Sequence, residues 1–292
     1  CIAILQQNMT LIEHDNEKVL ENNMLACWLN GQAIQTLSLT ERAFNYGDGL
    51  FSTIAIRQGQ ASLIDLHWQR LVQGCRRLLI DCQNLAQWQE DFLRFMALYP
   101  NCIAKIIVSR GVGGRGYLPE ANQNTHCYFY AYPSHHHPQH YQQGIDTDFL
   151  QQKLSCGKLL AGLKHLNRLE QVLLRQELAQ TSFPEAIVCN EQGYVIEGVF
   201  SNLFIIKNGQ LQTPRLDLSG VDGVMRRHLL SLAQQILLPT QIINISPSDM
   251  LTADEVFFCN SLYGIWPVKR LAEKTFAQNP VTQQLQSLLH YV

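Results

Sequence analysis

The chain has 292 residues, a formal net charge of −2 at pH 7, and 46% hydrophobic residues. This length and apolar content can bury a substantial core, in two domains or one large one. Positive and negative residues are scattered, so no basic patch of the kind that binds nucleic acid is present. No apolar run approaches the roughly 18 residues that span a bilayer. We therefore expect a globular protein that binds neither nucleic acid nor membranes.

Nine cysteines stand at irregular spacings without a Cys-x-x-Cys pair. This pattern argues against zinc ribbons and redox dithiols, and reduced, buried cysteines fit a reducing cytosol better. The N-terminus also lacks the basic region, apolar stretch and small-residue cleavage site of a signal peptide. The sequence therefore predicts a cytoplasmic protein.

Residues 1–23 differ in character from the rest of the chain. Their polar stretch from His14 to Lys18 interrupts the sequence before Met24, which is expected to be the true start. We treat residues 1–23 as an N-terminal appendage, with partial helical order expected and no function assigned.

Residues 24–134 predict a domain of strands with two helices. An Asn-Gly pair between two short apolar runs near the start indicates a β-hairpin. A glycine-punctuated turn then leads into an alternating strand, and helical spacing follows over 64–78 and 85–98. Strands are expected over 103–109 and 125–132, joined by a glycine-rich stretch.

The composition changes abruptly between Pro133 and His140, where prolines flank a polar run with four histidines. Such a run is typical of a linker. It predicts an interdomain linker over 135–145 and a C-terminal domain over 146–292. No carboxylate or cysteine ligand is interleaved with the histidines, so we predict no metal site.

Helical spacing after Lys164 predicts an amphipathic helix in the C-terminal domain. Its apolar stripe, expected to face the core, consists of Leu166, Leu169, Val172 and Leu173. Lys164 would then lie at the junction of a loop and a helix, where its side chain can point into a cleft.

The remainder of the C-terminal domain mixes strands with helices. Strands are predicted over 185–189, 194–197, 202–206, 210–213 and 255–259. A helix should open at Gly220-x-x-Gly223, and a last helix should close the chain near 281–289. Because helices and strands do not alternate strictly, the pattern favours an α+β fold over a doubly wound sheet.

Lys164 is the candidate nucleophile. A lysine removed from water favours its neutral form, and a neutral amine can attack a carbonyl to form a Schiff base. That chemistry points to an aldehyde cofactor. The alternative interpretation is a solvated lysine at the start of a helix.

A pyridoxal phosphate site requires a lysine, an anion-binding cradle and a partner for the pyridine nitrogen. The turn before the Gly223 helix offers free backbone N–H groups at Val224 and Met225, where the helix dipole favours negative charge. Glu197 is flanked by apolar residues and is expected to be buried, where a protonated pyridine nitrogen would be its partner. The alternative for Glu197 is a strand carboxylate that faces solvent.

Six ordered motifs cover nearly everything from Met24 onward. They are Arg42-Ala-x-x-Tyr-Gly-Asp-Gly-x-Phe, His67-Trp-Gln-Arg70-Leu, Lys164-His-Leu-Asn-Arg, Glu197-Gly-x-x-Ser-Asn-Leu-Phe, Gly223-Val-Met-Arg and Asn260-Ser-x-x-Gly-Ile-x-Pro-Val. In these motifs the chain resembles the fold type IV pyridoxal-phosphate enzymes. That group contains branched-chain and D-amino-acid aminotransferases and the aminodeoxychorismate lyases.

Within this group the chain is most similar to the bacterial aminodeoxychorismate lyases, through residues 109–117, 160–175 and 213–226. The aminotransferases typically carry a glutamate two residues beyond the x of Gly-Asp-Gly-x. This chain has Ser52 there, followed by Thr53, which argues against transamination. The rival interpretations are a D-amino-acid or branched-chain aminotransferase and a catalytically silent relative that only binds the cofactor or a carboxylate ligand.

The resemblance implies a two-domain α+β fold with a smaller N-terminal α/β sandwich and a larger barrel-like C-terminal domain. It also implies a homodimer with its site near the subunit interface. The expected reaction converts 4-amino-4-deoxychorismate to 4-aminobenzoate and pyruvate in folate synthesis.

The resemblance also assigns roles to individual residues. Lys164 would be the Schiff-base lysine and the proton-abstracting base, and Glu197 the partner of the pyridine nitrogen. The other implied cofactor contacts are Arg70, Val224 and Met225 at the phosphate, and Asn260 and Ser261 near the phosphate or substrate. Arg110, Arg115 and Tyr117 are expected to hold substrate carboxylates, because guanidinium groups bind them well. Thr53 is expected to position the substrate or pass a proton to the leaving group.

Overall fold

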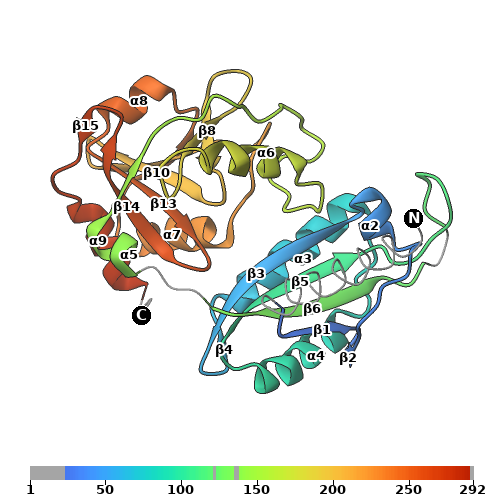
Figure 1. Ribbon diagram of the computed structural model, residues 1–292. Coiled ribbons are helices and arrows are strands. Elements are labelled where there is room, and N and C mark those ends of the chain that lie inside the picture. The colour runs from blue at the N-terminus through green and yellow to red at the C-terminus, as the bar shows by residue number, and fades with distance from the viewer. Residues whose placement is uncertain (1–23, 121–122, 135–137, 290–292) are drawn as a thin grey trace, which may run out of the picture.

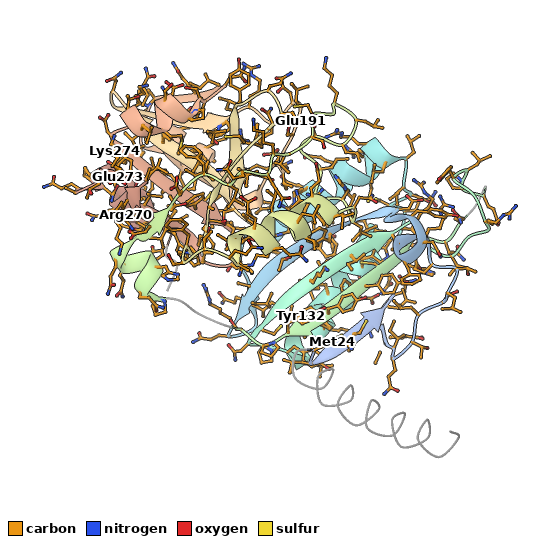
Figure 2. The ribbon with its side chains drawn as sticks, turned by 45° about the horizontal axis from the view of Figure 1, so that its top comes forward. Met24, Tyr132, Glu191, Arg270, Glu273 and Lys274 are labelled. Atoms are coloured by element: carbon orange, nitrogen blue, oxygen red, sulfur yellow. The ribbon has the colours of Figure 1, made fainter. Side chains whose placement is uncertain are left out.

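A computed structural model describes residues 24–120, 123–134 and 138–289. They form two lobes (Figure 1), a small lobe that ends with Tyr132 and a large lobe that begins at Pro138. In Figure 2, Tyr132 lies on the small lobe, and Arg270, Glu273 and Lys274 lie at the outer edge of the large lobe. The expected appendage, residues 1–23, lies outside the described residues.

The small lobe contains an antiparallel sheet of six strands in the order β2-β1-β6-β5-β3-β4. The strands are β1 (Ala26–Leu29), β2 (Gln32–Ala33), β3 (Gly49–Arg57), β4 (Gln60–Ala61), β5 (Cys102–Ser109) and β6 (His126–Tyr132). Helices α3 (Ile64–Leu78) and α4 (Leu85–Leu98) cover one face, and both have the predicted bounds. A short helix, α2 (Arg42–Tyr46), precedes β3 in the segment predicted only as a turn.

The core of the small lobe is an aromatic cluster between the helices and the sheet. Phe92 of α4 meets Trp68 of α3 edge-to-face at 5.9 Å and Phe129 of β6 at 5.3 Å, and it stacks on Phe95. All four side chains are buried. Aromatic pairs of this geometry stabilise a core beyond the area that they bury, so the cluster fixes α3, and with it the site residues on α3, against the sheet.

The large lobe contains a sheet with strand order β12-β11-β10-β13-β14-β15, and β7 pairs with β14 as well. Its strands are β7 (Ile145–Thr147), β10 (Asn202–Lys207), β11 (Gln210–Pro214), β12 (Thr240–Ile243), β13 (Glu255–Asn260), β14 (Gly264–Leu271) and β15 (Lys274–Thr275). Within the described residues no ladder joins β12 to β15, so the sheet is open. The α+β class is confirmed, whereas the barrel-like closure expected for this lobe is not observed.

Helices α7 (Val224–Gln235) and α9 (Pro280–Leu288) pack on one face of this sheet, against Phe204 and Phe257. The hairpin of β8 (Ile187–Cys189) and β9 (Val195–Gly198) packs on the other. Helix α8 (Pro247–Thr252) begins with a capping box, in which Ser246 and Asp249 bond each other's backbone N–H. No helix of the described residues is long and apolar enough to cross a membrane.

The segment expected to be a linker is partly helical. Residues 135–137 lie outside the described residues, but α5 (Pro138–Gln143) follows them and packs on β14. The Tyr141 hydroxyl donates to the carbonyl of Gln286 at 3.1 Å, and the Gln286 amide donates back to the carbonyl of Tyr141 at 2.8 Å. These bonds tie α5 to the large lobe, and the exact domain boundaries stay a prediction.

The predicted stripe after Lys164 is wrong in two respects. The helix, α6 (Leu169–Leu178), begins five residues after the lysine, and it buries Leu174 and Leu178. Leu169, Val172 and Leu173 are instead 71%, 50% and 44% exposed. Apolar spacing identifies one face of a helix but not what covers it, and nothing in the described chain covers this one.

We expect Phe92→Ala to lower the free energy of unfolding by about 3–5 kcal/mol, because it opens a cavity in the aromatic cluster. Leu93→Ala, one position along the same helix, removes a largely exposed side chain and should change stability by under about 0.5 kcal/mol. Urea denaturation followed by circular dichroism measures both. Equal losses in the two variants would contradict the assigned core.

Candidate active site

The Lys164 segment pairs with the start of β3. The Phe51 amide donates to the carbonyl of Lys164 at 2.9 Å, and the Leu166 amide donates to the carbonyl of Gly49 at 3.0 Å. Lys164 is therefore held in a segment that bonds β3, five residues before α6, rather than at the predicted junction of loop and helix. The guanidinium of Arg168 donates to the carbonyls of His165 and Leu163, and this folds the chain around the lysine.

Two glycines allow this pairing. A Cβ on Gly49 would lie 2.5 Å from the carbonyl oxygen of Val108 and 2.9 Å from the Leu166 side chain. Gly47 has φ 60°, and a Cβ there would lie 2.5 Å from the amide oxygen of Asn167. Only glycine fits such an approach and such a backbone, so the Gly-Asp-Gly motif is a docking surface for the Lys164 segment.

The same segment is tied to the turn before α7. The Gly162 amide donates to the carbonyl of Gly220 at 2.9 Å, and the Asp222 amide donates to the carbonyl of Gly162 at 3.0 Å. The turn ends at Gly223, the N-cap of α7, which supplies no side-chain cap. Val224 and Met225 occupy the first turn of the helix, where unpaired backbone N–H groups and the helix dipole attract anions.

Lys164 has the electrostatics of a nucleophilic amine. Burial, assisted by the positive charge of Arg70, lowers its pKa to about 7. Its ammonium nitrogen lies 4.5 Å from the centre of the Phe51 ring. Near neutral pH a large fraction of this amine is therefore unprotonated, as nucleophilic and general-base roles require.

Glu197 lies buried at the end of β9, as predicted. Burial raises the pKa of its carboxyl group to about 7, opposed by the backbone N–H of Val221, which donates to Oε2 at 2.8 Å. No hydrogen bond to Oε1 is found within the described residues. A protonated ring nitrogen beside Glu197 would stabilise its ionised form.

Arg70 projects from α3 into a buried polar chain. Its Nη2 donates to the Ser52 hydroxyl at 2.6 Å, and that hydroxyl lies 2.7 Å from His67 Nδ1. Burial, and the positive charges of Arg70 and Lys164, hold the pKa of His67 well below its usual range. Ser52 accepts from Arg70, and the tautomer of the neutral histidine sets the direction of the hydrogen bond between Ser52 and Nδ1. The buried Nε of Arg70 has no hydrogen-bond partner among the residues that the structure describes.

Lys164 and Arg70 share the wall of a cavity of about 380 Å³. Its other cationic lining groups are Arg77, Lys158, Arg226 and Arg227, against the carboxylates Asp217 and Asp222. Glu197, Val224, Met225, Asn260 and Ser261 lie outside this wall. The cavity is thus an anion-attracting approach to the lysine and to Arg70.

Ser261 links the two lobes beside β3. Its hydroxyl donates to the carbonyl of Thr53 at 2.9 Å, while the Asn260 carboxamide oxygen accepts from the amides of Leu262 and Tyr263. The structure therefore brings Thr53 and Ser261 together, and Asn260 shapes the turn between β13 and β14.

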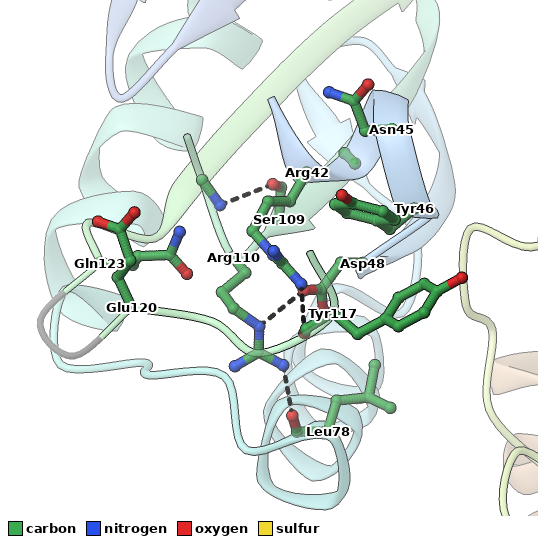
Figure 3. Close-up of polar contacts among 12 residues, drawn as sticks. Arg42, Asn45, Tyr46, Asp48, Leu78, Ser109, Arg110, Tyr117, Glu120 and Gln123 are labelled. Atoms are coloured by element: carbon green, nitrogen blue, oxygen red, sulfur yellow. Dashed lines mark hydrogen bonds and ion pairs between the residues drawn. The ribbon is translucent and has the colours of Figure 1, made fainter. Parts of the chain in front are cut away.

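The predicted carboxylate ligands lie in a different part of the small lobe. Arg110 donates from Nε to Asp48 at 2.8 Å and from one terminal nitrogen to the carbonyl of Leu78 at the end of α3 (Figure 3). Its other terminal nitrogen donates to the carbonyl of Leu79. All three nitrogens of its guanidinium group therefore already donate hydrogen bonds within the protein. Arg115 and Tyr117 are exposed, and Tyr117 and Arg110 line a second hollow of about 420 Å³ whose wall excludes Lys164.

Sequence reasoning missed two positioning carboxylates. Glu185 is buried and accepts from the amides of Ala186, Val199 and Phe200 and from the Ser201 hydroxyl, which fixes the turn after Glu197. Glu41 is buried at the start of α2 and accepts from Ser109, His126 and Tyr128. Glu41 precedes the Arg42 motif and Glu185 precedes the Glu197 motif. Only tertiary contacts distinguish such a buried glutamate from one on the surface.

The chain matches the sequence profile of a known family. The sequence profile of the class IV aminotransferases matches residues 49–271, which include Lys164, Arg70 and Glu197. The protein belongs to the class IV aminotransferase family. Among the described residues no group of His, Cys, Asp and Glu is arranged to hold a metal ion, and His135–His137 lie outside them.

Two relatives carry the same enzyme name. The chain is 36% identical to the aminodeoxychorismate lyase of Vibrio harveyi, over 90% of this chain and 99% of that protein. It is 42% identical to the crystal structure of the Pseudomonas aeruginosa 4-amino-4-deoxychorismate lyase, with a TM-score of 0.87 over 90% of this chain and 97% of that one. A putative branched-chain aminotransferase of Methanocaldococcus jannaschii is 27% identical over 82% of this chain and 86% of that protein.

Pyridoxal phosphate is the cofactor of this family, and the residues present fit it. Lys164 offers an amine, the first turn of α7 and the unpartnered Nε of Arg70 offer donors for a phosphate, and Glu197 offers a buried carboxylate. The amine, the phosphate donors and the carboxylate that the cofactor requires are thus all present, and each has hydrogen-bonding capacity left unused within the described chain.

We expect the amine of Lys164 in the cofactor-free protein to react with pyridoxal phosphate along a pH curve with its midpoint near 7. The lowered pKa leaves the amine neutral above that pH, whereas an ordinary lysine becomes neutral only near pH 10.5. Borohydride trapping at a series of pH values, followed by peptide mass spectrometry, measures the yield at Lys164 and at exposed Lys153. A Lys164 curve that coincides with the Lys153 curve would contradict the assigned environment.

Proposed function

We propose that this protein converts 4-amino-4-deoxychorismate to 4-aminobenzoate and pyruvate, as a carbon-carbon lyase of folate and 4-aminobenzoate synthesis. The observation that carries the proposal is the likeness to two lyases over nearly the full length of both chains. The Ser52 position supports it, because its hydroxyl is committed to Arg70 and His67 where the aminotransferases typically carry a glutamate.

Pyridoxal phosphate, when bound, supplies an electron sink for the carbon that loses a proton. The neutral amine of Lys164 takes that proton from the carbon bearing the substrate nitrogen. Glu197 would hold the ring nitrogen in its charged form, and Arg70 with the N–H groups of Val224 and Met225 would hold the phosphate. Loss of the enolpyruvyl group then leaves an aromatic ring, which favours elimination.

The remaining roles follow from position. Thr53 lies on the face of β3 that carries Phe51, whose ring contacts the Lys164 amine. Its hydroxyl is proposed to guide the substrate or pass a proton to the leaving group. Asn260 and Ser261 complete the site at the lobe junction. Of the predicted carboxylate ligands, Arg115 and Tyr117 retain exposed polar groups, while Arg110 holds the loop that carries them.

The protein is further proposed to be a cytoplasmic homodimer. The exposed face of α6, with Leu169, Val172 and Leu173, is an apolar surface of the kind that associates, and Phe44 and Leu118 are also exposed near the second hollow. The eight cysteines of the described residues are all unpaired, which fits a reducing compartment.

We expect the purified protein to release pyruvate and 4-aminobenzoate from 4-amino-4-deoxychorismate. Pyruvate can be followed with lactate dehydrogenase, alongside an assay of keto-acid-dependent amino transfer from D-alanine and L-leucine. Lys164→Ala should abolish both the visible absorbance of the covalently bound cofactor and turnover, because it removes the amine that bonds the cofactor and takes the proton. Robust amino transfer without pyruvate would establish the aminotransferase alternative, and turnover by Lys164→Ala would refute the role of Lys164.

We expect Leu169→Glu to weaken the dimer, because a charge on the apolar face of α6 would be desolvated at the interface. Light scattering over a dilution series measures the mass. Leu237→Glu is the matched control, since Leu237 is 89% exposed on another surface of the large lobe. Unchanged dimerisation in Leu169→Glu would place the interface elsewhere.

A further inference from the structure

One face of the small-lobe sheet is turned away from α3 and α4 and carries a row of functional side chains. Thr53 of β3 pairs directly with Lys105 of β5, and Lys105 pairs in turn with Tyr130 of β6. Directly paired residues of neighbouring strands share a face, and so do residues two apart on one strand. Phe51 therefore lies on this face as well, diagonal to Lys105.

Phe51 links this row to the reacting lysine. The ammonium nitrogen of Lys105 lies 5.0 Å from the centre of the Phe51 ring, and that of Lys164 lies 4.5 Å from the same point. The two nitrogens are therefore separated by no more than the sum of these distances. Both amines therefore lie around one aromatic ring, close enough to contact the same small ligand.

Lys105 lacks an anionic partner within the described residues. It is half-buried, its ammonium nitrogen lies over the Phe51 ring, and among the described residues no carboxylate or carbonyl accepts a hydrogen bond from that nitrogen. Burial lowers the pKa of its ammonium group from the ordinary lysine value. Three donors on a partly desolvated cation without an acceptor are unfavourable in the free protein and suited to an anionic ligand.

We propose that Lys105 is a specificity-determining residue that binds the ring carboxylate of the substrate, the group that becomes the carboxylate of 4-aminobenzoate. The proposal rests on the lyase function proposed above. With the substrate nitrogen at Lys164, the ring lies against Phe51 and its far carboxylate reaches the Lys105 ammonium. Thr53, paired with Lys105, then lies beside the same ring.

The position of Arg110 strengthens this assignment. All three of its nitrogens donate to Asp48 or to the carbonyls at the end of α3, so its fork has a complete set of partners. Lys105, by contrast, contacts the same Phe51 ring as Lys164. Among the described residues its ammonium group donates no hydrogen bond. A carboxylate held there would form a charge-assisted hydrogen bond in a partly desolvated site.

The first test compares Lys105→Met, which keeps the length and removes the charge, with Lys105→Arg and with Lys153→Met on an exposed segment. For Lys105→Met we expect KM for 4-amino-4-deoxychorismate to rise about 10- to 100-fold, the size expected for one hydrogen bond to a charged group. Its kcat should change by less than about threefold. Lys105→Arg should recover part of the affinity, and Lys153→Met should match the wild type.

The second test measures binding without turnover. Isothermal titration of the cofactor-loaded protein with 4-aminobenzoate and with aniline isolates the contribution of the carboxylate. We expect the wild type to prefer 4-aminobenzoate at least about tenfold, and Lys105→Met to bind the two compounds alike. The visible cofactor absorbance of each variant should match that of the wild type, which shows that Lys164 and the fold are intact.

Retained preference for 4-aminobenzoate in Lys105→Met would overturn the proposal, as would a fall in kcat with KM unchanged. A shifted pH midpoint of the cofactor absorbance with retained preference would also overturn it, because Lys105 would then act only on the charge of Lys164. Absence of pyruvate release by the wild type would refute the lyase function instead, so the two failures are distinguishable.

Discussion

The backbone pairing of the Lys164 segment is the constraint on which the site depends. One side of this segment bonds the first residues of β3, and the other bonds the turn that opens α7. These contacts bring a strand of the small lobe and a helix N-terminus of the large lobe to a single lysine. Backbone hydrogen bonds position groups more rigidly than long side chains can, so the amine, the anion cradle and Phe51 keep a fixed geometry.

Electrostatics adapt the same site to proton transfer. Burial moves the pKa of Lys164 down and that of Glu197 up, and both arrive at about 7. At neutral pH neither group is locked in its charged form. A cofactor that gives Glu197 a cationic partner and consumes the amine of Lys164 relieves both desolvation penalties, which couples its binding to the stability of the site.

Much of the fold could be predicted because local periodicity carries it. The bounds of α3 and α4 agree with the helical spacing, and β5, β6 and β10 lie where alternating or apolar runs place them. The errors concern what local patterns do not encode. The spacing after Lys164 identified an apolar face, yet Leu169 and Val172 are exposed, because burial depends on which surface packs opposite.

The sequence by itself determined the chemical inventory: a lysine, a glutamate and a glycine-opened helix, in motifs specific enough to name the family. Tertiary structure alone decided how each group is used. It committed the fork of Arg110 to Asp48 and the end of α3, gave Ser52 to Arg70 and His67, and set Lys105 beside Phe51 with Lys164. These assignments join residues far apart in the chain, and hydrogen bonds and desolvation depend on distance in space rather than on order in the sequence.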